Sequence, residues 1–332
     1  MKKTITKILI VSGEPAGIGL DLCLKLAYKK FDAEISILTN RNALLDRAIL
    51  QKKEVELLAK PSLHKGNGKL HIINVPYIKK VFPGMLEKSN SLAQLNAIDF
   101  AVSECMQKKY DALVTLPLNK KILSSSRKKF TGHTEYISIL CGTKNKEVML
   151  LVNKNNLRVA LVTTHIALVD VPKSITKKKL EQTIKTLNTD LINNFKIKKP
   201  RITITGLNPH AGEDGEFGTE EKKIITPVIK KLTNEGLNLI GPIPADTAFT
   251  EKYIKNTDSF LTMYHDQGLA PFKALSFNHG VNTTLGLPII RTSVDHGTAI
   301  ELVGSKKINA NSFYESITLA INLAKNKKND SR

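Results

Sequence analysis

Residues 259–273 read SFLTMYHDQGLAPFK, and the rest of the chain is interpreted outward from them. The apolar run 259–264 predicts a buried strand that ends abruptly at His265 and Asp266. A helix-breaking glycine and Lys273 follow. In open α/β sheets, polar groups just past the carboxyl end of a strand are the usual place for a site. This stretch therefore predicts an α/β fold with its chemistry at the strand ends.

Two other segments repeat this arrangement of a strand followed by a histidine. LRVALVT (157–163) leads to His165, and RITITG (201–206) leads to His210. If the three strands lie side by side with aligned ends, these two histidines and His265 converge on one metal ion. Three neutral imidazoles with open positions make a catalytic metal site. The alternative that each histidine is an ordinary hydrogen-bonded surface or core residue stays open, since the gaps of 45 and 55 residues match no short zinc motif.

The length and composition indicate a chain of two domains with an ordinary core. Its 332 residues exceed the size at which single cores usually stop growing. No apolar stretch approaches the ~18 residues that span a bilayer, so we expect no membrane association. The start, MKKTITKILIVSG, lacks the apolar region of a signal peptide and continues into a first strand. Three cysteines without a close pair suit a reducing compartment, and we expect a cytoplasmic protein.

The net charge of +20 raises the question of nucleic-acid binding. The lysine pairs are scattered along the chain, tryptophan is absent and aromatic residues make up only 5%. Stacking platforms for bases are therefore missing, and we expect no nucleic-acid partner. A positive field can still steer phosphorylated or carboxylated substrates toward a cleft.

A glycine turn near the start of the chain predicts an anion-binding position. The strand KILIV (7–11) runs into SGEPAGIG (12–19), which opens a helix with an apolar face. Such a turn lets the backbone approach a ligand at a helix N-terminus, where N–H groups favour anions. The spacing is not G-x-G-x-x-G, so it carries no Rossmann fingerprint, and a plain tight turn remains the alternative.

The rest of the chain alternates strands and helices, with polar residues where several strands end. Thr131 or Thr134 is expected to cap a helix running to Leu140, which places His133 at a positive helix end. An acidic glycine loop at 212–218 precedes a helix predicted at 219–234, and GPIPADT brings Asp246 to a turn. Further elements are predicted as strands at 35–39, 71–75, 112–116, 147–152 and 237–240, and as helices at 89–109, 175–195 and 312–324.

Together, these segments resemble the 4-hydroxythreonine-4-phosphate dehydrogenase family, NAD-dependent enzymes of pyridoxal phosphate synthesis, across nearly the whole chain. The resemblance is carried by GEPAGIG (13–19), GHTEY (132–136), NPHAGEDGEFGTEE (208–221), GPIPADT (241–247), YHDQGLAPFK (264–273) and VNTTLGLPIIRTSVDHGTA (281–299).

The resemblance implies a fold, a quaternary structure and a site. The fold is the two-lobed α/β fold of isocitrate and isopropylmalate dehydrogenases, with a cleft between the lobes. Segments 1–128 and 278–332 form the cofactor-side lobe, and 129–277 form the lobe that binds metal and dimerises. Facing protomers of a homodimer supply the metal ligands. The implied ligands are His165, His210 and His265; the substrate contacts are His133, Thr134, Lys273, Asn282 and Arg291; and the cofactor contacts are Gly13, Asp295, His296, Gly297 and Thr298.

Two departures from the family pattern concern the cofactor. Leu20 stands where the family usually has proline, and ELVGSK (301–306) replaces a loop normally richer in glycine and aspartate. NAD is the expected cofactor, with NADP as the alternative.

The implied reaction oxidises the secondary alcohol of 4-phosphooxy-L-threonine and then releases carbon dioxide, leaving 3-amino-2-oxopropyl phosphate. Imidazole ligands favour zinc or cobalt over magnesium, which remains an alternative. Lys273 and Arg291 supply positive charge for the phosphate, and Arg291 can do so with two parallel hydrogen bonds. Asp246 and Asp266 are the candidates for proton relay or for orienting metal ligands.

Three other functions remain open from the sequence. A metal-dependent hydrolase would use the same histidines to activate water, and a nucleic-acid-binding protein would use the positive charge. A relative within the same family would act on another phosphorylated or aromatic hydroxy acid.

Overall fold

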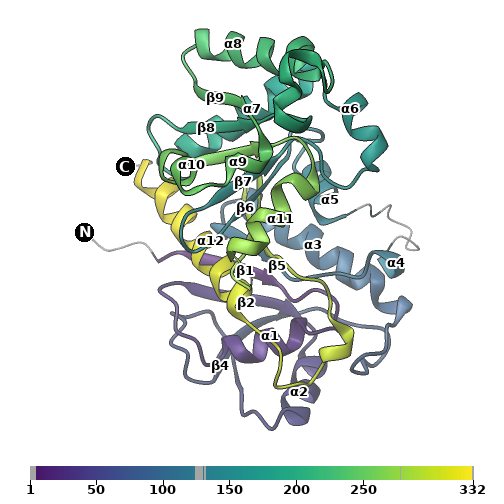
Figure 1. The fold of residues 1–332 in the computed structure, drawn as a ribbon. Coiled ribbons are helices and arrows are strands. Elements are labelled where there is room, and N and C mark those ends of the chain that lie inside the picture. Colours follow the sequence, from purple (N-terminus) through teal and green to yellow (C-terminus); the bar gives the residue numbers. More distant parts are fainter. Residues whose placement is uncertain (1–4, 124–129, 131, 277, 331–332) are drawn as a thin grey trace. The chain divides into compact units, whose positions relative to one another are not determined.

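The computed structural model describes residues 5–123, 130, 132–276 and 278–330. The chain divides into two compact units (Figure 1). Unit 1 comprises Met1–Asn145 and Leu287–Arg332, and unit 2 comprises Lys146–Gly286. Among the described residues, 132–145, which the resemblance grouped with the metal-binding lobe, fall in unit 1, and 278–286, which it grouped with the cofactor-side lobe, fall in unit 2. His133 and Thr134 share unit 1 with Arg291 and with the glycine turn.

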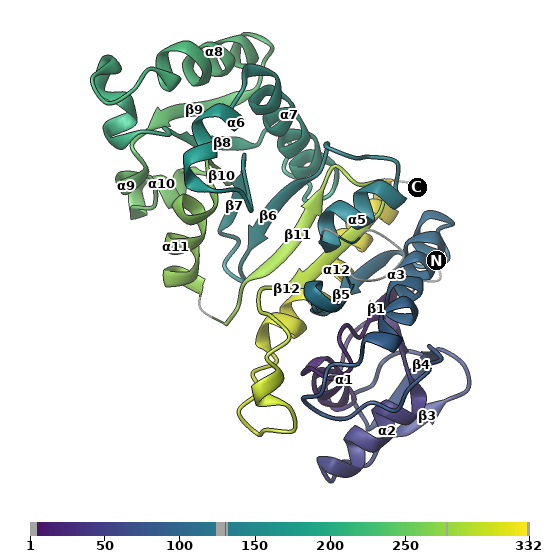
Figure 2. The same ribbon diagram turned by 90° about the vertical axis from the view of Figure 1, so that its right-hand side faces the viewer.

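Unit 1 is built on a parallel sheet ordered β3-β4-β2-β1-β5-β12. Figure 2 shows β12, β5 and β1 side by side. The strand order reverses at β1, and such a switch point is where ligands bind in open α/β sheets. The glycine turn follows β1 directly. The strands are β1 (Lys7–Val11), β2 (Glu34–Thr39), β3 (Glu56–Leu58), β4 (Lys69–Asn74), β5 (Ala112–Thr115) and β12 (Ile290–Val294).

Helices cover both faces of this sheet. Leu9 and Val11 pack with Ile98 of α3, whereas Ile8 and Ile10, equally buried, alternate with them and so face the other side. The helices of unit 1 are α1 (Gly19–Leu26), α2 (Arg41–Leu50), α3 (Ser91–Met106), α4 (Lys120–Leu123), α5 (His133–Leu140) and α12 (Asn311–Asp330), with 3-10 turns at Lys88–Asn90 and Ile300–Leu302.

Unit 2 has a mixed sheet ordered β11-β6-β7-β10-β8-β9. The pairs β11/β6 and β6/β7 are antiparallel, so the consecutive strands β6 and β7 form a hairpin, and the remaining pairs are parallel. The strands are β6 (Val148–Val152), β7 (Arg158–Leu161), β8 (Arg201–Thr205), β9 (Asn238–Ile243), β10 (Ser259–Thr262) and β11 (Val281–Leu285).

The three strands that precede the metal-site histidines are neighbours. β10 lies between β7 and β8, with Phe260 opposite Val159 on one side and Thr203 on the other. Because all three strands are parallel, their carboxyl ends share one edge of the sheet. The expected alignment of these strands is confirmed.

Two helix starts differ from expectation, one in unit 2 and one, that of α5, in unit 1. The helix predicted at 219–234 begins with a π-helical turn, and its α-helical part starts only at Thr226, where Pro227 lacks the N–H that would continue the earlier ladder. Thr134 does not cap α5, because Gly132 holds the N-cap position; Thr131 lies outside the described residues. The helices of unit 2 are α6 (Val171–Ser174), α7 (Lys177–Asn193), α8 (Thr226–Asn234), α9 (Ala245–Ala248), α10 (Glu251–Asn256) and α11 (His265–Ser276), with 3-10 or π turns at Leu168–Asp170, Pro209–Gly215 and Glu221–Ile225.

The expectation that Gly268 breaks a helix is wrong. Residues His265–Ser276 form α11, which continues through Gly268. A Cβ at Gly268 would lie 2.5 Å from Thr262 Oγ1 and 2.8 Å from a methyl group of Leu161. Glycine is needed here for the close approach of α11 to the sheet, not for a turn.

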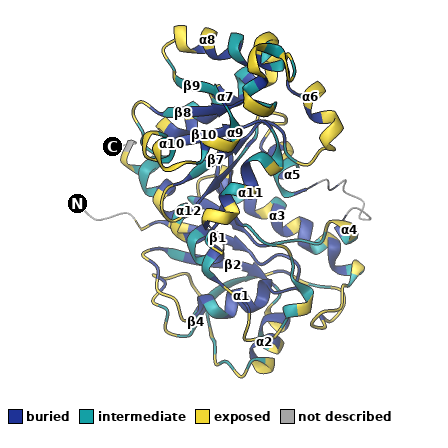
Figure 3. Cartoon of the chain, viewed as in Figure 1, coloured by how far each residue is buried: buried dark blue, intermediate teal, exposed yellow. Residues whose placement is uncertain are grey.

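Burial follows this layered arrangement. The central strands of each sheet are largely buried, whereas the outer strands β3, β4 and β9 are mostly half-buried or exposed, and much of α6 and α8 is exposed (Figure 3). Among the described residues, every helix is too short or too polar to cross a lipid bilayer.

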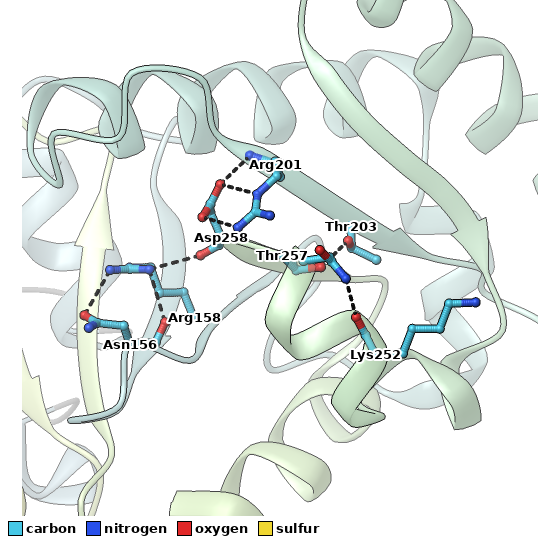
Figure 4. A network of polar contacts seen from close by, with 8 residues as sticks. Asn156, Arg158, Arg201, Thr203, Lys252, Thr257 and Asp258 are labelled. Carbon is cyan, nitrogen blue, oxygen red and sulfur yellow. Dashed lines mark hydrogen bonds and ion pairs between the residues drawn. The ribbon is translucent and has the colours of Figure 1, made fainter.

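A polar network joins the amino-terminal ends of β7, β8 and β10 (Figure 4). The Asp258 carboxylate accepts hydrogen bonds from the backbone N–H, Nε and Nη2 of Arg201, at 2.8, 3.1 and 3.1 Å. Arg158 donates to the Asp258 carbonyl at 3.2 Å. Burial raises the pKa of Asp258, but these hydrogen bonds outweigh it and hold the pKa below its usual value.

We predict that Asp258→Asn destabilises the protein at neutral pH. A depressed carboxyl pKa contributes stability above the unfolded-state pKa, which is lost as pH falls through the folded-state pKa. Solvent screening of the partly exposed Arg201 keeps the expected loss near ~1 kcal/mol. Urea denaturation at successively lower pH should show the two proteins converging. Glu251→Gln, which breaks the exposed pair with Lys255, is the control and should change little. A constant difference at all pH values would contradict the prediction.

Candidate active site

The glycine turn and the segment 295–299 meet in unit 1. The Ile18 N–H donates to the Thr298 carbonyl at 3.0 Å, and a Cβ on Gly17 would lie 2.7 Å from the same oxygen. Gly13 has a φ of +74°, and a Cβ there would lie 2.3 Å from the Pro117 carbonyl oxygen. Glycines are therefore required where the turn passes β5 and the 295–299 loop. Two segments that were both expected to bind the cofactor are therefore adjacent, although Ile18 and Thr298 are 280 positions apart in the chain.

His296 presents a polar atom to this region. Its Nδ1 lies 3.0 Å from the Gly297 carbonyl, and its buried Nε2 has no hydrogen-bond partner in the described part of the chain. Burial lowers the pKa of His296, against the opposing effects of Gly297 and Asp295, and favours the neutral ring. With Nδ1 as the donor to Gly297, Nε2 is an acceptor for a ligand hydroxyl or amide. Gly297 borders open space, which leaves room for that ligand.

A buried ion pair supports both segments, and the sequence analysis missed it. Asp21 of α1 and Arg47 of α2 are almost completely buried and hydrogen-bonded to each other. Arg47 also donates to the carbonyls of Gly17 and Pro15, at 3.1 and 3.2 Å. The second oxygen of Asp21 accepts from the Gly304 N–H at 2.9 Å. This Asp21–Arg47 pair therefore links the glycine turn to the loop that follows the 295–299 segment.

Arg291 forms the cationic part of unit 1. The residue is 3% exposed, and its guanidinium donates through Nε and Nη2 to Thr115 Oγ1, at 3.1 and 2.7 Å. Nη1 lies 3.5 Å from Thr134 Oγ1 at the start of α5. Burial lowers the pKa of Arg291 to about 10, while Glu135 opposes this effect, so the group stays charged. Thr115, the last residue of β5, fixes this side chain and was not singled out from the sequence.

His133 lies beside this charge and is held neutral. Burial, Arg291 and Lys120 together lower its pKa to about 3. Its Nε2 is buried without a hydrogen-bond partner among the described residues. A neutral imidazole next to a fixed guanidinium can donate to an anionic ligand without adding a charge. His133, Thr134 and Arg291 are thus brought together, as expected for a phosphate or carboxylate contact.

In unit 2, His165 and His265 come together at the shared strand edge. Their ring centres lie 5.5 Å apart. Two imidazoles bound to one tetrahedral metal at about 2.0–2.1 Å have ring centres roughly 5 Å apart, so this spacing fits a shared ion. His265 Nδ1 lies 2.7 Å from Asp266 Oδ1, which leaves Nε2 for the metal. A carboxylate on the other nitrogen is the usual support of a metal-binding histidine.

His210 does not join this pair within the chain. Its Nδ1 lies 3.6 Å from Glu213, and its ring packs against Phe217. In the part of the chain that the structure describes, no three His, Cys, Asp or Glu side chains are close enough to hold a metal. The convergence of three histidines is therefore not found within one protomer.

The reason is the backbone that carries His210. Residues 210–214 all have positive φ, between 40° and 85°, which makes a left-handed turn. Such a conformation costs about 1–2 kcal/mol for each residue other than glycine. Glu221, which the sequence analysis did not single out, supports the turn: its buried carboxylate accepts from the N–H groups of Leu207 and Asn208, at 2.7 and 2.8 Å. Backbone strain of this kind is concentrated at functional sites.

The remaining expected site residues of unit 2 lie in separate elements. Lys273 is exposed on α11, two turns beyond His265, and Asn282 is half-buried on β11. Asp246 is exposed in the first turn of α9. Gln267 links two of the strand ends, since its side chain bonds Thr205, Gly206 and Met263 at 2.7–2.8 Å.

Comparison with known proteins places this site in a family. The family model described as pyridoxal phosphate biosynthetic protein PdxA matches residues 31–320. The 4-hydroxythreonine-4-phosphate dehydrogenases of Pseudomonas putida and Vibrio parahaemolyticus are 41% and 42% identical, over 97% and 98% of this chain and 98% and 99% of theirs. A crystal structure of the Klebsiella pneumoniae enzyme of that name superimposes with a TM-score of 0.85 at 30% identity, covering 96% of this chain and 99% of that one. A Burkholderia xenovorans terephthalate 1,2-cis-dihydrodiol dehydrogenase, at 23% identity and a TM-score of 0.67, covers 96% and 98% and shares the fold. The chain therefore belongs to the PdxA family of pyridoxal phosphate biosynthetic proteins.

Proposed function

We propose that this protein is a 4-hydroxythreonine-4-phosphate dehydrogenase that oxidises 4-phosphooxy-L-threonine with NAD. The secondary alcohol loses a hydride to the nicotinamide and a proton to a base, which gives a β-keto acid. The carboxylate carbon then leaves as carbon dioxide, and protonation of the resulting enolate gives 3-amino-2-oxopropyl phosphate. The observation that carries the proposal is the buried Arg291 beside neutral His133, in the same unit as the glycine turn.

The phosphate fits the chemistry of Arg291, His133 and Thr134. Thr115 orients the guanidinium, so little side-chain entropy is lost when an anion binds. His133 and Thr134 add neutral donors. We also assign Lys273 and Asn282 to substrate binding, as a second cation and an amide donor; this assignment rests on the family motifs.

The cofactor fits the meeting of the glycine turn with residues 295–298. Backbone N–H groups at the start of α1 favour a pyrophosphate, and Gly13 permits close approach. His296 Nε2 supplies an acceptor in the same region. NAD accepts the hydride when bound. We propose NAD as the cofactor and keep NADP as the alternative, because ELVGSK (301–306) departs from the family loop.

A divalent metal fits the donor set of unit 2. His165 and His265 would hold it, with His210 supplied by the facing protomer of a homodimer. Imidazole nitrogens favour zinc or cobalt over magnesium. Such an ion acts as a Lewis acid toward the alcohol and the ketone. Asp266 orients His265, which is its proposed role here, and Asp246 is the proposed proton relay.

Exposed apolar side chains beside His165 support the homodimer. Ile166, Leu168 and Val169 are 42%, 69% and 78% exposed. Three large exposed apolar groups within four residues are typical of a surface that another protein covers. Burial of this segment between two protomers would bring partner residues close to His165.

A steady-state assay tests the proposal directly. The protein is given 4-phosphooxy-L-threonine with NAD or NADP, and nicotinamide reduction is followed before and after chelation. We expect reduction with release of carbon dioxide, loss of activity on chelation and recovery on adding zinc or cobalt. Turnover of an aromatic dihydrodiol instead would assign the protein to another substrate.

We predict that Arg291→Lys impairs turnover selectively for the phosphorylated substrate. Lysine keeps the charge but loses the planar fork that a phosphate binds bidentately. Losing one charge-assisted contact costs roughly 1.5–3 kcal/mol, or about ten- to a hundredfold in kcat/KM. Unphosphorylated 4-hydroxythreonine should already be a poor substrate of the unmodified protein and should lose little more. Equal losses for both substrates would show that Arg291 does not bind the phosphate.

We predict that Asp266→Asn weakens metal binding about ten- to a hundredfold, because His265 loses the carboxylate that orients it. Metal affinity is measured by competition with a chromogenic chelator, independently of turnover. Asp246→Asn is the matched control: it removes an equally exposed carboxylate and should leave metal affinity unchanged while slowing turnover. Equal weakening in both variants would contradict the assignment of Asp266.

We predict that the Asp21–Arg47 pair affects cofactor binding separately from stability. Arg47→Met leaves a buried carboxylate unpaired, which costs about 3–5 kcal/mol. Asp21→Leu combined with Arg47→Met should restore much of that stability. NAD affinity should nevertheless remain weak in the double variant, since the hydrogen bonds to Pro15, Gly17 and Gly304 are still missing. Thermal unfolding and NAD titration measure the two effects. Recovery of both together would reduce the pair to a structural role.

A further inference from the structure

Unit 1 contains a concave surface away from the glycine turn. Its volume is about 880 Å³, and we call it the basic hollow. It lies past the last turn of α1, roughly 12 Å along that helix from the glycine turn, given about 1.5 Å per residue. It is lined by Lys25, Tyr28, Lys29, Lys52, Lys53, Glu54, residues 308–311 and Tyr314.

The positive charge of the basic hollow is not neutralised by the protein. Its four lysines face a single carboxylate, Glu54, and none of them forms an ion pair within the described residues. Burial, and after it the charge of Lys25, lowers the pKa of Lys53, against the opposing charge of Asp21, which is itself paired with Arg47. Uncompensated ammonium groups in one concavity repel one another, and a bound anion would relieve this repulsion.

A comparable surface in unit 2 behaves differently. A hollow of about 840 Å³ there is also lined by lysines, including Lys177 and Lys178. In it, Glu181 pairs with Lys185 at 2.9 Å and with Lys231 at 2.8 Å. Lys146, Lys177 and Lys178 line the same hollow without an ion pair to Glu181 among the described residues, so lysine content alone does not distinguish the two surfaces. The basic hollow differs in its aromatic lining, Tyr28 and Tyr314, which the lining of the unit 2 hollow lacks.

Aromatic rings and a helix start complete the basic hollow. Lys29 lies 5.5 Å from the ring centre of Tyr314, and Lys53 lies 5.5 Å from that of Tyr28. Tyr28 is 50% exposed, so its ring is accessible to a ligand. The 20-residue helix α12 begins at Asn311, and its dipole favours negative charge at this end. The first N–H is already bound by Asn309, so the helix adds a field rather than that donor.

We propose that the basic hollow is a binding site for a nucleoside triphosphate, with the phosphates on the lysines and the base against Tyr28. A terminal phosphate carries roughly 1.5–2 negative charges, so a triphosphate matches four lysines where a single phosphate does not. The volume suits a ligand of this size, since small-molecule sites occupy about 300–1,000 Å³. Aromatic side chains bind any base through its face. The proposal is independent of the dehydrogenase activity.

Calorimetric titration of the full chain with ATP at fixed ionic strength tests this site. Lys25→Gln combined with Lys53→Gln should weaken ATP binding at least tenfold, since each removes a charge-assisted contact. Lys177→Gln combined with Lys178→Gln, which changes the net charge equally in the other hollow, should weaken it less than twofold. Tyr28→Ala should weaken binding of ATP but not of inorganic triphosphate.

Four results would overturn the proposal. One is the absence of saturable ATP binding to the unmodified protein. Another is an equal loss in both lysine pairs, which would reduce the effect to net charge. Tighter binding of a single-stranded oligonucleotide than of ATP would show that the basic hollow binds nucleic acid and not a small nucleotide. Displacement of ATP by NAD at equal stoichiometry would assign the hollow to the dehydrogenase cofactor.

Discussion

The parallel alignment of strands is the constraint on which the candidate site residues of each unit depend. In unit 1, the reversal of strand order at β1 leaves a gap beside its carboxyl end, and the glycine turn occupies that end. In unit 2, the placement of β10 between β7 and β8 brings the segments of three histidines to one edge. Any shift of one strand by a residue would turn its side chains to the opposite face and separate these groups.

Close packing near these edges requires glycine. Gly17 lets the turn touch the Thr298 carbonyl, and Gly268 lets α11 lie against Thr262 and Leu161. Glycine is needed at both positions because the backbone of one element approaches another more closely than a Cβ allows. The functional side chains are therefore carried by elements that have little freedom to move apart.

Buried polar groups stabilise the parts of the site that regular structure does not. The left-handed turn at 210–214 is unfavourable by itself, and the Glu221 carboxylate satisfies the backbone that leads into it. The Asp21–Arg47 pair does the same for the glycine turn. Arg47 donates to carbonyls of that turn, and Asp21 accepts from the Gly304 N–H in the loop after residues 295–299. Such pairs add little net stability, but they select one conformation among several.

The sequence by itself determined the fold class, most of the elements and the family, because hydrophobic periodicity and short motifs are local properties. It also indicated the strand-end histidines, and it grouped His133, Thr134 and Arg291 through their family motifs. It could not show Thr115 beside Arg291, nor Asp21 beside Arg47, since these contacts join residues 176 and 26 positions apart. One signal was present: Arg47 occupies a position on the buried face of α2, beside Leu44 and Ala48. Tertiary structure alone decided that His165 meets His265 while His210 stays apart, because the backbone angles of a left-handed turn depend on the buried Glu221 that supports it.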